Sequence, residues 1–324
     1  RALDAITMAA WLDREGLTDA HLRWYLDYCC RDDYGGGASE VSAWAGLHYF
    51  ASRHGFHAPG GDHDAHDAVL TWPEGNAWLA ERMAAPLREH IHGGCVALRI
   101  VEGRHEVEVD VWNAASKQVE RWRAPQVVLA TPLFIAARLL QSPPAALAVA
   151  AAAMRHAPWL VANVHLDAAL DDPPGAPPSW DNVRYGAPGL GYVDAMHQST
   201  RPHPGPTVLT CYASWGADPA HRAALLQQPW SQRAAQVVQE LSVAHPDLPP
   251  KMAQVDLMRY GHAMSIPLPG VRSSAALRTL AAQRGRVLFA HGDLAGYSIF
   301  EEALFHGTRA AEACLRRDAA TANS

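Results

Sequence analysis

Two residues near the C-terminal end of the sequence combine a type and a position that suit ligand binding. Gly292 and Asp293 follow the apolar run Val287–Ala290, which predicts a strand buried on both faces. Ligands of open α/β sheets bind beyond the carboxyl ends of the strands. A carboxylate there can accept hydrogen bonds from ligand hydroxyl groups, and it can equally cap the local turn. Asp293 is therefore a candidate ligand-binding residue.

The residues that follow predict the start of a helix close to Asp293. Ser298 precedes Glu301 by three positions, which is the capping-box pattern, so a helix is expected to begin at Ile299. The first-turn amides and the dipole of a helix favour negative charge, and a flavin gains such charge on its pyrimidine edge when it is reduced. Capping boxes are common in α/β proteins, so this pattern alone does not identify a cofactor.

The segment 258–270 (MRYGHAMSIPLPG) carries two further candidates, Tyr260 and His262. A histidine whose pKa is near neutrality can act as a general base. A packed loop histidine fits the sequence equally well, and aromatic residues such as this tyrosine lie more often in a core than in a substrate cage. Both residues are therefore the weaker candidates for catalysis.

Two other chemistries find little support in the sequence. The segment 61–67 (GDHDAHD) contains aspartate and histidine, which bind divalent metals. Its spacing matches neither HxHxDH nor HExxH, and glycine and proline flank it, so we expect a solvated loop and no metal site. A Ser-His-Asp hydrolase is also disfavoured because no GxSxG motif is present.

The elements that must position these residues follow from hydrophobic periodicity. Two short helices are expected within residues 3–31, a third from residues 39–40 onward, and others from Ala77 and over residues 229–244. Alternating segments predict a β-meander, a continuous apolar run after it predicts a strand buried on both faces, and further segments predict longer half-buried strands. These segments are residues 95–102, 106–112 and 118–123, then 126–132, then 158–167, 189–196, 207–215 and 252–260.

Three of these segments together resemble a known family. Residues 286–315 (RVLFAHGDLAGYSIFEEALFHGTRAAEACL) look like the C-terminal flavin motif of the flavin-containing amine oxidases. Residues 71–83 (TWPEGNAWLAERM), the meander and residues 127–132 (VVLATP) are similar to that family's central flavin-domain segment, in the same order. The resemblance covers about residues 69–140 and 285–316, and the stretch between them only in layout.

The resemblance implies an α/β fold with an α+β part. A partial FAD/NAD(P)-binding, Rossmann-like domain would be interleaved with a mixed-sheet substrate domain. The expected divisions are a substrate or helical part (1–68), an FAD-binding part (69–150), a substrate domain (151–279), the C-terminal FAD-binding part (280–318) and a tail (319–324).

The resemblance also implies a role for each matching position. The implied FAD-binding residues are Val96, Thr131, Pro132, Gly292, Asp293, Ser298, Ile299 and Phe300. Val96 would meet the adenine through its backbone, and Thr131 would line the cofactor groove together with Pro132. Asp293 would bind hydroxyl groups on the ribityl or diphosphate side.

The resemblance also implies roles for the start of the C-terminal helix, for Tyr297 and Tyr260, and for His262. Ser298, Ile299 and Phe300 would offer their amides to the flavin ring. Tyr297 would form one wall of an aromatic substrate cage. Tyr260 and His262 would lie where the family's substrate sheet faces the ring, so Tyr297, Tyr260 and His262 are the implied catalytic residues.

One feature of the family pattern is absent from the sequence. The family opens with an apolar strand and a GxGxxG motif, whereas Gly35–Gly37 follow no apolar strand. We therefore expect a truncated fold that retains FAD weakly. The expected function is an FAD-dependent oxidoreductase that takes a hydride from a carbon next to an amine, or from a comparable activated C–H. A non-catalytic binding or assembly protein that kept the fold is the alternative.

The composition limits the classes of molecule that the protein is expected to bind. The net charge of −6 disfavours nucleic acid as a partner, and no apolar run reaches the roughly 20 residues of a membrane span. The five cysteines are scattered, which is typical of reduced thiols in a cytoplasmic protein. The expected partner is a small-molecule substrate, with amines as the candidate class.

Overall fold

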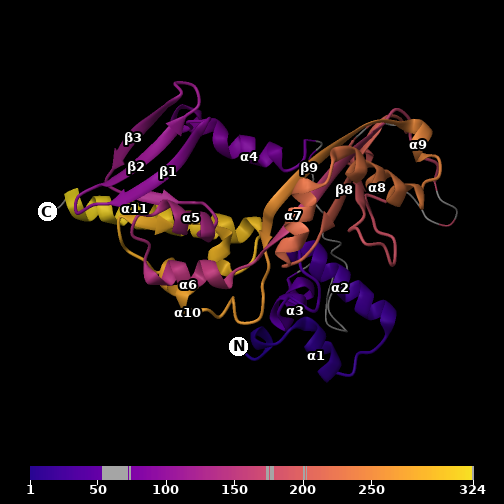
Figure 1. Ribbon diagram of the computed structural model, residues 1–324, viewed down its shortest axis with the longest axis horizontal. Helices are drawn as coiled ribbons and strands as arrows, with labels where there is room; N and C mark the ends of the chain where they lie inside the picture. The colour runs from indigo at the N-terminus through magenta and orange to yellow at the C-terminus, as the bar shows by residue number, and fades with distance from the viewer. Residues whose placement is uncertain are drawn as a thin grey trace. The chain divides into compact units, whose positions relative to one another are not determined.

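The computed structural model describes residues 1–52, 72, 74–172, 175, 179–199, 201 and 203–322 (Figure 1). The chain forms two compact units. Unit 1 comprises Arg1–Ala5, Leu87–Arg155 and Ser265–Ser324, and unit 2 comprises Ile6–Pro86 and His156–Met264. Helices combine with parallel and antiparallel strands, so the predicted α/β fold class with an α+β part is confirmed.

The β-meander of unit 1 is confirmed by a three-stranded antiparallel sheet in the order β1-β2-β3. Its strands are β1 (Cys95–Glu102), β2 (Val107–Asn113) and β3 (Gln118–Ala124), which lie side by side in Figure 1. Alternation decides which face is covered, because successive side chains of a strand point to opposite faces. Val107 and Val111 of β2 are buried accordingly.

The second sheet of unit 1 is a parallel pair. Strand β4 (Val127–Leu129) pairs with β10 (Val287–Phe289), with Leu129 opposite Phe289. Burial on both faces was expected for both strands. It is confirmed for β10, whose three residues are all buried, but it is wrong for β4, where Val128 is 40% exposed. The core covers only one face of β4.

Helices complete the core of unit 1. The helices α5 (Leu133–Leu139), α6 (Ala145–Ala153) and α10 (Ala275–Ala281) surround a cluster that includes Leu133, Leu147 and Phe289. The 3-10 helices η1 (Leu3–Ala5) and η4 (Gly292–Ala295) and the long helix α11 (Phe300–Ala322) belong to this unit. The short helix η2 (Ala85–His90) runs across the boundary between the units.

The helix α11 begins one residue after the position that the capping-box pattern predicts. The Ser298 hydroxyl serves a different contact, because its Oγ accepts a hydrogen bond from the Ser265 N–H (2.9 Å) and lies 2.8 Å from the Ser265 Oγ. Gly296 ends η4 with a φ of 87°, a conformation that favours glycine. The turn between η4 and α11 is therefore fixed by long-range contacts as well as by local sequence.

Unit 2 begins with three helices whose starts are set by side-chain caps: α1 (Met8–Arg14), α2 (Ala20–Tyr34) and α3 (Ala43–Ala51). The helix α4 (Ala77–Ala84) follows without a side-chain cap and begins at the predicted residue. The prediction that α3 starts at residues 39–40 was wrong. Ser42 caps the helix, and its Oγ accepts from the Ala45 N–H at 3.2 Å.

A five-stranded sheet in the order β6-β7-β8-β5-β9 forms the rest of unit 2. Its strands are β5 (His156–Leu166), β6 (Asp181–Asn182), β7 (Tyr192–Asp194), β8 (Thr207–Ser214) and β9 (Met252–Ser265). The remaining elements are η3 (Ala195–Gln198), α7 (Pro219–Gln227), α8 (Trp230–Ser242) and α9 (Leu248–Lys251). Leu241 of α8 packs with Leu209 and Val164 of the sheet, and Figure 1 shows α8 beside β8.

Three of the compositional expectations can be compared with the structure. None of the helices in the described part of the chain has the length and apolarity that a membrane crossing requires. The five cysteines are free thiols. No group of three metal-ligating side chains occurs among the described residues, and the segment 61–67 lies outside them.

Candidate functional site

The carboxyl ends of the parallel strands β4 and β10 meet at one edge of unit 1. The Ala290 N–H donates to the Leu129 carbonyl at 2.9 Å, which extends the pairing to the ends of both strands. Both chains therefore leave the sheet at the same place. The structure brings together four predicted site residues there: Thr131, Pro132, Gly292 and Asp293.

Asp293 is fully buried at this edge and links the two segments. Its Oδ2 accepts a hydrogen bond from the Leu133 N–H at 2.9 Å, and its Oδ1 lies 3.3 Å from the His291 Nδ1. Leu133 opens α5, so the carboxylate satisfies an amide in the first turn of that helix. The sequence left ligand binding and capping open for Asp293, and the structure shows a capping bond.

Thr131 carries a polar atom that the described residues leave unsatisfied. Its Oγ1 is buried and has no hydrogen-bond partner within the described part of the chain. A buried hydroxyl without a partner costs about 1–3 kcal/mol. The hydroxyl lies just after β4, at the strand end where a bound ligand is expected, so a polar ligand at this edge would supply the missing partner.

Tyr297 is held inside unit 1. Its side chain is 3% exposed, and its hydroxyl donates to the Glu302 Oε1 at 2.9 Å. The Arg272 guanidinium lies 5.8 Å from the ring centroid. The sequence did not predict the contacts of Tyr297 with Glu302 and Arg272, because no local motif links these residues.

The start of α11 presents a mixed set of groups. Ile299 is partly buried, and Phe300 is 52% exposed. Glu301 and Glu302 place two carboxylates in the first turn. These carboxylates already interact favourably with the helix dipole, so they oppose the accumulation of further negative charge at this helix start.

Val96 lies apart from the β4–β10 pair in the sheet order. It is on β1, opposite Trp112 of β2, and 56% of its side chain is exposed. Its backbone belongs to the meander, which is a separate sheet from the parallel pair. The structure therefore does not gather all the predicted cofactor residues into one sheet.

Tyr260 and His262 lie in unit 2, on β9. They are two residues apart, so they share one face of the strand. Tyr260 is 50% exposed, and His262 is exposed with its ring centroid 6.2 Å from that of the buried His156. The strand presents both candidate catalytic side chains on the same side.

A buried pair in unit 2, Tyr192 and His245, could not be predicted from the sequence. The Tyr192 hydroxyl lies 2.5 Å from the His245 Nε2, and His245 is 5% exposed. Burial lowers the pKa of His245 and raises the pKa of Tyr192 to about 12. Both groups are therefore neutral near pH 7, and nothing in the local sequence marks them as partners.

The pKa of His245 predicts how stability depends on pH. Because the folded-state pKa is lowered, the unfolded chain binds more protons as the pH falls through the ordinary histidine pKa of about 6.5. The contribution of neutral, buried His245 to the free energy of unfolding is therefore fully present above that pH, and it decreases as the pH falls from about 7 to 5. Urea unfolding of a His245→Gln variant is expected to show a smaller decrease over that interval. The exposed His105 provides the control, because His105→Gln is expected to keep the wild-type slope.

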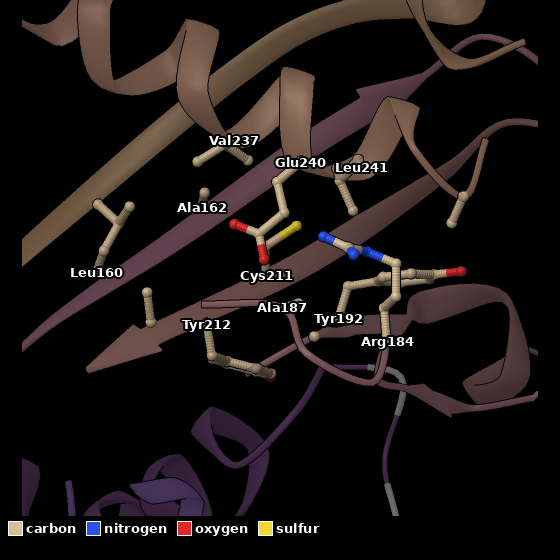
Figure 2. Close-up of a pocket in the computed structure, with 13 residues that line it drawn as sticks. Leu160, Ala162, Arg184, Ala187, Tyr192, Cys211, Tyr212, Val237, Glu240 and Leu241 are labelled. Atoms are coloured by element: carbon tan, nitrogen blue, oxygen red, sulfur yellow. The ribbon is translucent and has the colours of Figure 1, made fainter. Parts of the chain in front are cut away.

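A cavity of about 60 Å³ lies in unit 2 between α8 and the sheet (Figure 2). Its walls are mainly apolar, and two charged side chains, Arg184 and Glu240, also line it. The Glu240 Oε1 accepts a hydrogen bond from the Gly189 N–H at 3.1 Å. The other lining residues are Leu160, Ala162, Ala187, Gly191, Tyr192, Cys211, Tyr212, Ala213, Val237, Leu241 and Ala244.

Comparison with solved structures shows which known proteins share the fold of this chain. No protein-family model matches the sequence, and no curated protein sequence is similar to it. Among solved structures, the cyclohexylamine oxidase from Brevibacterium oxydans IH-35A is similar over 98% of this chain and 69% of its own, with 18% identity and a TM-score of 0.65. Wild-type putrescine oxidase bound to putrescine is similar over the same shares, with 16% identity and a TM-score of 0.67. The chain has the fold of these amine oxidases.

Proposed function

We propose that the chain belongs to the flavin-containing amine oxidase family and forms part of an FAD-dependent oxidoreductase that acts on an amine. The observation that carries the proposal is the likeness in fold to two amine oxidases over 98% of the chain. The edge formed by β4 and β10 supports it independently, because a buried hydroxyl there lacks a partner among the described residues.

Unit 1 contains the residues that would hold FAD. Thr131 would hydrogen-bond to the cofactor through Oγ1, Pro132 and Gly292 would line its groove, and Asp293 would fix the groove's shape by holding α5. The bound FAD would supply the acceptor for a hydride from the carbon next to the amine nitrogen. The implied contacts of Val96 and of the α11 start, residues 298–300, are part of the same proposal.

Unit 2 would supply the substrate side. His262 would accept the proton that a protonated amine must lose before its carbon can give up a hydride. Tyr260 shares that face of β9 and would orient the amine. Tyr297, which belongs to unit 1, would act as an aromatic wall whose position is fixed by its hydrogen bond to Glu302.

The Thr131→Val substitution tests the cofactor assignment. Valine has nearly the shape of threonine and lacks the hydroxyl, so the variant is expected to bind FAD about fivefold to tenfold more weakly, as the loss of one hydrogen bond implies. The measurement is quenching of flavin fluorescence on titration with the protein. Thr210→Val is the matched control, because Thr210 lies in unit 2 and bonds to Asn163.

The outcome also distinguishes the alternative function. A wild-type chain that leaves the fluorescence of added FAD unchanged would contradict the oxidoreductase proposal. A binding or assembly protein would then be favoured. Anaerobic bleaching of a bound flavin by cyclohexylamine or putrescine would instead support amine oxidation.

A further inference from the structure

The cavity of unit 2 carries one positive and one negative side chain on walls that are otherwise mainly apolar. Figure 2 shows the Arg184 guanidinium and the Glu240 carboxylate extending toward one another across the cavity, and the apolar side chains of Leu160 and Val237 on its walls. Within the described part of the chain neither charged group takes part in an ion pair. The cavity is therefore lined by a guanidinium and a carboxylate that form no ion pair with each other.

The position of the Glu240 carboxylate is fixed by the backbone. Its Oε1 accepts from the Gly189 N–H at 3.1 Å. A Cβ at Gly189 would lie 2.6 Å from that oxygen, so only glycine permits this approach. The half-buried carboxylate is therefore anchored to the backbone through Oε1, and the same side chain lines the cavity.

We propose that this cavity binds a small α-amino acid in its zwitterionic form. The ammonium group would donate to Glu240, and the carboxylate would accept from the planar donor fork of Arg184, which matches carboxylate geometry. The side chain would contact the apolar wall at Leu160, Ala162 and Val237. One net-neutral molecule pairs with the exposed Arg184 and the half-buried Glu240 at once, whereas a plain amine or a plain acid pairs with only one of them.

The size of the cavity limits the ligand. Each enclosed water requires about 10–15 Å³ of such space, so about 60 Å³ holds only a few waters or a group of similar bulk. L-Alanine is therefore the appropriate probe. This site goes beyond the proposed oxidoreductase activity, and its binding does not require FAD.

Isothermal titration calorimetry of the complete chain with L-alanine at pH 7 tests the proposal. Saturable binding with one site per chain is expected, and Glu240→Gln and Arg184→Gln are each expected to weaken it at least tenfold. Glutamine at position 240 keeps an acceptor for the Gly189 amide. Glu81→Gln is the control, because Glu81 is exposed on α4 of the same unit, and its affinity is expected to equal that of the wild type.

Two analogues test the pairing of charges. Ethylamine and propanoate, which each carry one of the two charges, are expected to bind at least tenfold more weakly than L-alanine. Equal affinity for either analogue would overturn the zwitterion assignment. The absence of saturable heat with the wild type, or unchanged affinity in both charge variants while their circular dichroism is native, would overturn the site itself.

Discussion

The Asp293→Ala variant is expected to unfold with about 2–3 kcal/mol less free energy than the wild-type chain. The carboxylate is fully buried and accepts the Leu133 N–H at 2.9 Å. Alanine would leave that amide buried without its acceptor, and the penalty for an unsatisfied buried donor previously bonded to a charged group is of this size. Urea-induced unfolding followed by circular dichroism gives the value.

Asp293→Asn separates the structural role from the cofactor role. Asparagine keeps an oxygen that can accept from Leu133, so most of the stability lost in the alanine variant is expected to return. If the carboxylate also binds FAD hydroxyl groups, the asparagine variant is expected to fold normally while its affinity for FAD falls. Wild-type affinity in a stable Asp293→Asn chain would show that Asp293 acts only through α5.

The Phe289→Ala variant is expected to lose about 3–5 kcal/mol of unfolding free energy. Phe289 is 1% exposed at the end of β10, where it lies opposite Leu129 and belongs to the main core cluster of unit 1. Truncation of this side chain removes buried apolar area and leaves a cavity beside the strand end. Because Gly292 and Asp293 follow after only two residues, FAD affinity is expected to fall as well.

Phe300 provides the matched control for that experiment. It has the same side chain, lies at the start of α11 and is 52% exposed, so Phe300→Ala is expected to change stability by less than about 1 kcal/mol. Thermal unfolding of both variants measures the difference. Equal losses in the two variants would contradict the assignment of the core of unit 1 to the β4–β10 pair.

The sequence alone determined the parts of this fold that depend on neighbouring residues. The alternation in residues 95–123 predicted the three strands of the meander, because the period of two in side-chain direction is a local property. The continuous apolar run before Gly292 predicted a strand buried on both faces, because every side chain of the run is apolar. The helix α4 begins at Ala77 as predicted. The order of the three motifs indicated the amine oxidase fold.

Only the tertiary structure decided which groups satisfy one another. Asp293 bonds to Leu133, Ser298 to Ser265 and Tyr192 to His245, and each pair joins segments that are far apart in the sequence or in different elements. The opposed charges of Arg184 and Glu240 also come from separate parts of unit 2. Periodicity and capping act over a few residues, whereas these contacts arise from how strands and helices pack, so no local pattern could name the partners.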